Sequence, residues 1–236
     1  MRYTFPLLIL LALISCLPLQ AQTPPSAQTM LDSAVAELQA ARSFRLSIHQ
    51  SGAPYPLAIT LDGAILIPAS LQSAEAQYIS PNELHISAAL RLFLTVYMDV
   101  YALDDRQWIS FPSGAPYFLL PAFDGFDVNR LLARGDGIER LAANLQGLAA
   151  LEMEGAERRQ LRARSAGELV SSLLFGFIEP TDDVLIDFWL SADGTFAQID
   201  MLMLETLTTA PDDPSRWHIA FSDYDAPRDF TAPSAD

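Results

Sequence analysis

The chain has 236 residues, half of them hydrophobic, and a formal net charge of −15. All 14 basic residues are arginines, so the sequence lacks both the lysine of a phosphate-binding P-loop and the amine of a Schiff-base enzyme. An isoelectric point near 4.4 argues against binding to nucleic acid, and the apolar content argues against intrinsic disorder. The composition therefore predicts a folded, acidic and unusually apolar protein.

Residues 1–15 are typical of an export signal. Arg2 precedes an apolar run at 5–14 that is too short to span a bilayer. The run ends at Cys16, the only cysteine of the chain, and Leu13-Ile14-Ser15-Cys16 resembles the lipobox of bacterial lipoproteins. In such proteins the thiol receives a diacylglycerol and the cysteine becomes the first mature residue. Two alternatives remain, cleavage by ordinary signal peptidase near Ala21 or a Cys16 that is only an apolar residue of the signal.

After the signal we expect a tether at 16–28, rich in proline and small polar residues, and one folded domain at 29–235. Apolar residues at spacings of three and four predict a helix over 29–42. The period then changes to two in a strand at 44–48, and the segment 57–67 predicts a hairpin around Asp62-Gly63.

The longest alternating stretch covers 84–103, where every second residue from Leu84 to Val100 is apolar. At about 3.3 Å per residue this stretch is too long for a single strand. We therefore expect two antiparallel strands that share an apolar face, followed by another strand at 107–111.

Helices are expected in the middle of the chain. They cover 127–132, 137–148 with Asp136 as N-cap, and 165–175 with Ser165 as N-cap and Glu168 at the capping-box position. Further strands are expected at 151–155, 158–164, 184–190, 196–206 and 217–221. Strands outnumber helices and alternating βαβ units are absent, which favours an α+β fold with helices over one face of an antiparallel sheet.

The sequence contains no recognisable catalytic constellation. His49, His85 and His218 are far apart without metal-ligand spacing, so we expect surface or edge histidines. The acidic pairs at 104–105, 182–183 and 212–213 fit a calcium or glycosidase site less well than ordinary turns. We expect no enzymatic activity, no metal and no other cofactor.

Two clusters are candidates for contact with a ligand. Arg158, Arg162 and Arg164 share one face of the expected strand, and they form either a head-group contact or an ordinary solvated face. The aromatic residues either line a ligand pocket or belong to a plain core. They are Phe175, Phe177, Phe188 and Trp189.

Several short motifs, in this order, resemble the LppX/LprA/LprF/LprG family of envelope lipoproteins. After the lipobox they are Ala41-Arg42-Ser43-Phe44, Arg106-Gln107-Trp108, Asp136-Gly137-Ile138, Met153-Glu154-Gly155, Phe188-Trp189-Leu190 and the stretch at 221–227. No single motif is specific, and the resemblance depends on their order and spacing over 29–235.

The resemblance implies a LolA/LolB-like fold, a curved antiparallel sheet forming a half-open barrel with helices packed over its concave face. It implies an extracytoplasmic protein, anchored by lipidated Cys16, that binds acylated lipid or glycolipid in an apolar cavity and carries it within the cell envelope. An envelope transporter is a further candidate partner, and nucleic acid is not. The alternative is a structural or sensory envelope lipoprotein with a filled core and no lipid cargo, and a hydrolase is the weakest hypothesis.

Acyl chains need a dry apolar lining and gain about 0.8 kcal/mol per buried CH₂ without any directional motif. Arg158, Arg162 and Arg164 are the candidates for contact with lipid head groups, and a solvated strand face is the favoured alternative. The expected cavity lining is Leu46, Ile86, Leu90, Leu92, Val96, Met98, Val100, Leu173, Leu174, Phe177, Phe188, Leu190, Ile199 and Met201.

Overall fold

The computed structural model describes residues 25–57, 60–61, 65–66, 69–104, 106–120, 131–151, 158–227 and 233. Within them, eleven strands form one antiparallel sheet in the order β8-β7-β6-β5-β4-β1-β13-β12-β11-β10-β9. They are β1 (Ser43–Ser51), β4 (Ser70–Ile79), β5 (Glu83–Arg91), β6 (Thr95–Leu103), β7 (Arg106–Ser110), β8 (Phe118–Leu120), β9 (Gln146–Leu151), β10 (Arg159–Ser165), β11 (Val184–Leu190), β12 (Phe196–Met203) and β13 (Arg216–Ser222). β2 (Thr60–Leu61) and β3 (Ile65–Leu66) form the separate hairpin that the sequence predicted, and its turn lies outside the described residues.

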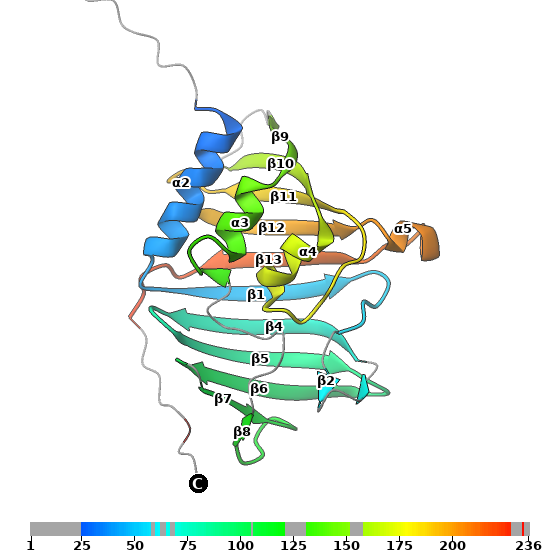
Figure 1. Cartoon of the computed structure of the whole chain (residues 1–236). Coiled ribbons are helices and arrows are strands. Elements are labelled where there is room, and N and C mark those ends of the chain that lie inside the picture. The colour runs from blue at the N-terminus through cyan, green and yellow to red at the C-terminus, as the bar shows by residue number, and fades with distance from the viewer. Residues whose placement is uncertain are drawn as a thin grey trace, which may run out of the picture.

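Helices cover one face of the sheet (Figure 1). α2 (Ala27–Ala40), α3 (Gly137–Ala143) and α4 (Gly167–Val170) lie in front of β9–β13 and β1, and α4 continues into the 3₁₀ helix η3 (Ser171–Leu174). The short helix α5 (Thr206–Thr209) lies at one end of the sheet. β8 and β9 stand at the two ends of the strand order, so the sheet is open. The predicted α+β architecture is confirmed.

Helix α2 follows from its cap and its apolar stripe. Ser26 Oγ accepts a hydrogen bond from Thr29 N at 3.1 Å, so the helix begins two residues earlier than the sequence predicted. Its buried side chains are Leu31, Ala34, Val35 and Leu38. They recur at helical spacing, and the helix contacts β9, β12 and α3 through its buried face.

Apolar side chains from successive strands meet on the face that the helices cover, which we call the inner face. The two strands predicted within 84–103 are confirmed as β5 and β6, paired from Glu83↔Leu103 to Arg91↔Thr95. One cross-strand row runs through the sheet as Leu161, Phe188, Ile199, Ile219, Ile48, Ala74, Ala88 and Met98. Since strand side chains alternate between faces, this register places the main hydrophobic core on the inner face.

Two predicted helices are wrong in extent. The helix predicted to reach residue 148 ends at Ala143, and β9 begins at Gln146, where Gly147 adopts φ +63°. Asp136 is at the N-cap position but makes no side-chain capping hydrogen bond. The positive φ at Gly147 is incompatible with a continuing helix, although Leu145 and Leu148 keep the helical spacing.

The helix predicted from Ser165 begins only at Gly167 and makes no capping hydrogen bond. Ser165 is instead the last residue of β10, paired with Val184. At Gly167 an added Cβ would lie 2.4 Å from Pro180 O, so only a glycine allows the backbone of residue 180 to pack this closely against the start of α4. The capping pattern in the sequence does not reveal this contact.

Several other expectations differ from the structure. Strands β4 and β8 were not predicted, and the strand expected to reach residue 206 ends at Met203, before α5. Most of the helix expected at 127–132 and of the strand expected at 151–155 lies outside the described residues.

Candidate functional site

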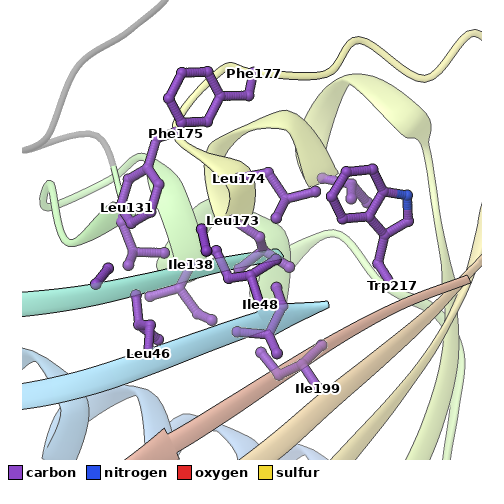
Figure 2. Packing of buried hydrophobic residues seen from close by; sticks show 14 of the residues in the cluster. Leu46, Ile48, Leu131, Ile138, Leu173, Leu174, Phe175, Phe177, Ile199 and Trp217 are labelled. Atoms are coloured by element: carbon purple, nitrogen blue, oxygen red, sulfur yellow. The ribbon is translucent and has the colours of Figure 1, made fainter. Parts of the chain in front are cut away.

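The predicted lining residues converge on the interior from both layers of the fold. Figure 2 shows Leu46, Ile48 and Ile199 of the sheet facing Ile138 of α3 and Leu173 of η3. Most of the predicted lining residues are buried, with exposed fractions between 0% for Ile199 and 8% for Phe177. A packed core and a cavity lining are both buried, so the cavity that these residues are expected to line remains a prediction.

The lining has two partly exposed members, Leu92 and Val96. Val96 is opposite Leu90 at the end of the β5–β6 pair, and Leu92 packs against the core. The inner face therefore reaches solvent at this end of the sheet.

Side-chain size divides the inner face into two halves. Large rings fill the half beneath the helices, where Phe188, Phe196 and Trp217 are 1% exposed. These side chains touch neighbours on nearly all sides, so this half is filled. The half formed by β4–β6 mixes larger side chains such as Leu84 and Ile86 with four small residues, and all of them are buried as well. The small residues are Ala74, Ala76, Ala88 and Ala102.

Trp217 adds a polar atom to the apolar interior. Among the described residues, its buried indole Nε1 has no hydrogen-bond partner, and its ring meets the ring of Tyr55 edge-on at 6.4 Å. Sequence reasoning missed this donor, because an aromatic residue in an alternating strand is indistinguishable from plain core. A buried unpaired donor costs free energy, about 1–3 kcal/mol, until an acceptor reaches it.

A separate polar pocket of about 550 Å³ lies beside the beginning of α4 and the segment that follows β12. It is lined by Ala166, Gly167, Glu168, Pro180, Thr181, Asp182, Asp183 and Leu204, and none of these is a predicted lining residue. The three carboxylates make the pocket unsuitable for an acyl chain.

Beside this pocket, Glu205 is a hydrogen-bonded carboxylate. It accepts hydrogen bonds from Thr181 N at 3.0 Å, from the Thr181 hydroxyl and from the Tyr55 hydroxyl. Burial acts to raise the pKa of Glu205, but these hydrogen bonds outweigh it, so the pKa is lowered. The pKa of Tyr55 is raised by burial and by the Glu205 carboxylate.

The three predicted head-group arginines are exposed on the outer face or next to it. Arg162 makes a bidentate contact with Asp187, with N···O distances of 2.7 and 2.8 Å, and Arg164 Nη1 lies 3.7 Å from Asp183 Oδ2. A lipid phosphate would have to compete with these carboxylates. Head-group contact through the arginines stays a prediction.

One sequence interpretation, the aromatic cluster, needs correction, whereas His49 and His218 are exposed, as expected of surface histidines. Trp189 does not join the other aromatic residues, because it faces outward and its Nε1 donates to Asp200 Oδ2 at 2.8 Å. His49 and His218, far apart in the sequence, are cross-strand neighbours, and His218 Nδ1 lies 2.8 Å from Asp200 Oδ1. Even so, the described residues include no group of three or more His, Cys, Asp or Glu side chains able to hold a metal ion. In the same part of the chain, no helix is long and apolar enough to cross a membrane.

The architecture is that of an open antiparallel sheet with helices over one apolar face, and two solved structures share it. LprF from Mycobacterium bovis matches with a TM-score of 0.62 and 13% identity, over 88% of this chain and 96% of LprF. The lipoprotein LppX from Mycobacterium tuberculosis matches with a TM-score of 0.54 and 11% identity, over 88% of this chain and 99% of LppX. No protein-family model and no curated protein matches the sequence. At these identities the likeness shows the fold, and at that level it confirms the predicted resemblance to the LppX/LprA/LprF/LprG lipoproteins.

Proposed function

We propose that the protein is an envelope lipoprotein that binds an acylated lipid or glycolipid against the inner face of its sheet and carries it within the cell envelope. The observation that carries the proposal is the apolar row that continues from β10 to β6 without a charged residue. The fold shared with LprF and LppX supports it. An acyl chain placed along this row would gain about 0.8 kcal/mol for each CH₂ removed from water.

The alanines of β4–β6 are the proposed seat of the acyl chain. Ala74 and Ala88 are directly opposite each other, and Met98 continues the row on β6. Small side chains occupy less volume above a sheet than the rings on β11–β13 do. Ala74 and Ala88 are 3% and 2% exposed, so an acyl chain seated there would displace the side chains that cover them. The chain would enter past Leu92 and Val96, where the inner face reaches solvent.

Trp217 supports one orientation of the lipid. It stands at the same end of the sheet as Val96, because β13 begins at Arg216 opposite Ser51 and β6 begins at Thr95 opposite Arg91. The unpaired indole N–H would donate to an ester oxygen, whose desolvation would otherwise be uncompensated. The acyl tails would then point inward along the alanines.

The proposal includes attachment to the outer side of a membrane through lipidated Cys16, which lies outside the described residues. Tether 16–28 would hold the domain, proposed to cover 29–235, close to the bilayer. A reaction catalysed by the protein and a bound cofactor are not part of the proposal.

One observation favours the alternative of a structural or sensory lipoprotein without cargo. Side chains such as Phe196 and Ile199 are almost fully buried, so the half of the interior beneath the helices is packed. Packing of this kind can serve as a rigid core, and binding there would require α3 and α4 to separate from the sheet.

Native mass spectrometry of the protein extracted from its own membranes tests the two functions. If the protein is a lipid carrier, its native mass spectrum is expected to include the added mass of a non-covalently bound lipid, in addition to any lipid joined to Cys16. Denaturation provides the control, since it removes bound cargo and leaves a covalent anchor in place. A protein that carries no lipid after extraction and takes up none from phosphatidylcholine vesicles would contradict lipid carriage and support the structural or sensory function.

A further inference from the structure

The turn between β5 and β6 exposes apolar side chains to solvent. Phe93 is fully exposed, and Leu94 and Tyr97 are 66% and 62% exposed. The turn is ordered by a hydrogen bond from Leu92 N to Leu94 O at 3.0 Å. Phe93 is thus held at the apex of a closed turn.

A second hairpin extends this surface. Ser110 of β7 is opposite Asp99 of β6, and Ser113 N donates to Tyr97 O at 2.7 Å. Phe111, which is 41% exposed, therefore lies next to the beginning of β6. We call the surface formed by Phe93, Leu94, Tyr97 and Phe111 the apolar tip.

The apolar tip has no charged residue within its own segments. The stretches 92–98 and 107–113 contain none, although 18% of the chain is charged. Asp99, which follows the first stretch, accepts hydrogen bonds from Ser87 Oγ at 2.7 Å and from Ser113 Oγ. This surface does not match a charged partner, but it matches a bilayer interface, where Phe and Leu enter the acyl layer and Tyr lies at head-group level.

The apolar tip is continuous with the interior. Leu92 and Val96 lie between the exposed apex and the buried residues Leu90 and Met98. A bilayer that receives the tip would meet the inner face at its open end.

We propose that the apolar tip is a membrane-contact site that seats in the interface of a lipid bilayer. Large exposed apolar surfaces on a folded domain mark sites of interaction, and burial in lipid removes the cost of hydrating Phe93 and Leu94. The membrane-contact site does not depend on what the interior binds, so it and the proposed cargo can fail separately.

Site-specific fluorescence on the full chain tests this proposal. Phe93→Cys adds one thiol, and the unsubstituted chain supplies the background because Cys16 is its only cysteine. The matched control is Leu119→Cys on β8, since Leu119 is a similarly exposed apolar residue, at 57%, outside the apolar tip. Each variant is labelled with an environment-sensitive dye and placed with phosphatidylcholine vesicles, with and without nitroxide on the acyl chains.

The dye at position 93 is expected to shift to the blue and to be quenched by the acyl-chain nitroxide, and the dye at 119 is expected to do neither. Added phosphatidylglycerol should not increase the quenching, because the chain is acidic.

Equal behaviour of the dye at both positions overturns the proposal. A blue shift without quenching also overturns it, because this would indicate contact with a second copy of the chain. Quenching that appears only with phosphatidylglycerol would assign the contact to the arginines and would also overturn it. Quenching at 93 in a protein that carries no cargo would keep the membrane-contact site and reject the lipid carrier.

Discussion

Glu205 shows how a single partly buried residue joins distant segments. Its carboxylate is bonded to Tyr55, after β1, and to Thr181, before β11. Hydrogen bonds to an ionised carboxylate are stronger than neutral ones, so this contact holds the loop at 53–57 against the α5 end of the sheet. The sequence offered no sign of it, because Tyr55 lies 150 positions and Thr181 lies 24 positions before Glu205 in the chain.

Glu205→Gln is expected to lower the free energy of unfolding at neutral pH by about 1–2 kcal/mol, through loss of these charge-assisted hydrogen bonds. The folded-state pKa of Glu205 lies below the ordinary value of 4.5, so its stabilisation is complete above that value and is lost as pH falls through the folded pKa. The variant should therefore lose less stability than the native chain on acidification. Urea unfolding at a series of acidic pH values measures this difference.

The control for this measurement is Glu37→Gln, at an exposed position of α2. It should keep the native dependence of stability on acid pH. An unchanged acid dependence in Glu205→Gln would show that this carboxylate does not contribute to folding in the way described.

At the level of secondary structure, strong alternation predicted strands reliably. β5, β6, β11 and β13 carry apolar residues at every second position, and all four were predicted. β4 was missed because its inner residues Ala74 and Ala76 are too small to contrast with Ser73 and Glu75. The small alanines that made β4 hard to predict belong to the proposed binding site for the acyl chain.

Ala88→Phe tests that seat at the level of the strand. If an acyl chain occupies the space above Ala88, a phenyl ring should take its place, so lipid uptake falls while the melting temperature is kept. If the space is already packed, the ring should cost about 1–3 kcal/mol in stability by overpacking. Calorimetry together with lipid counting by native mass spectrometry separates the two.

Ala89→Phe is the matched control, because Ala89 is opposite Tyr97 on the outer face of the same strand. It should change neither lipid uptake nor stability by a large amount. Loss of lipid uptake in both variants would show that uptake does not depend specifically on the inner face.

At the scale of the whole molecule, the sequence predicted the architecture and the composition of the interior, but not its state of packing. Periodicity shows which side of a strand is apolar, and it therefore identified Ile86, Phe188 and Ile199 as interior. Whether helices and sheet close upon each other depends on the fit of side chains between layers, as for Trp217 and Leu174 in Figure 2. That fit arises from contacts distant in sequence, which no local pattern records.

Anchoring is also a property of the whole molecule. The intact mass of the mature protein is expected to correspond to a chain that starts at Cys16 and carries a diacylglycerol. Cys16→Ser should abolish that added mass and release the protein from the membrane fraction. An unmodified N-terminus after Ala21, or retention of Cys16→Ser in the membrane fraction, would contradict the lipobox prediction.

The most direct test of lipid carriage is photo-crosslinking with a phosphatidylcholine that bears a diazirine near the end of one acyl chain. After irradiation of the membrane-extracted protein, peptide mass spectrometry locates the adducts. Lipid carriage predicts adducts on the inner face of β4–β6, at Ala74, Ala88 and Met98, and their loss in Ala88→Phe. Adducts confined to the outer face or to the apolar tip, with none on the inner face, would contradict it.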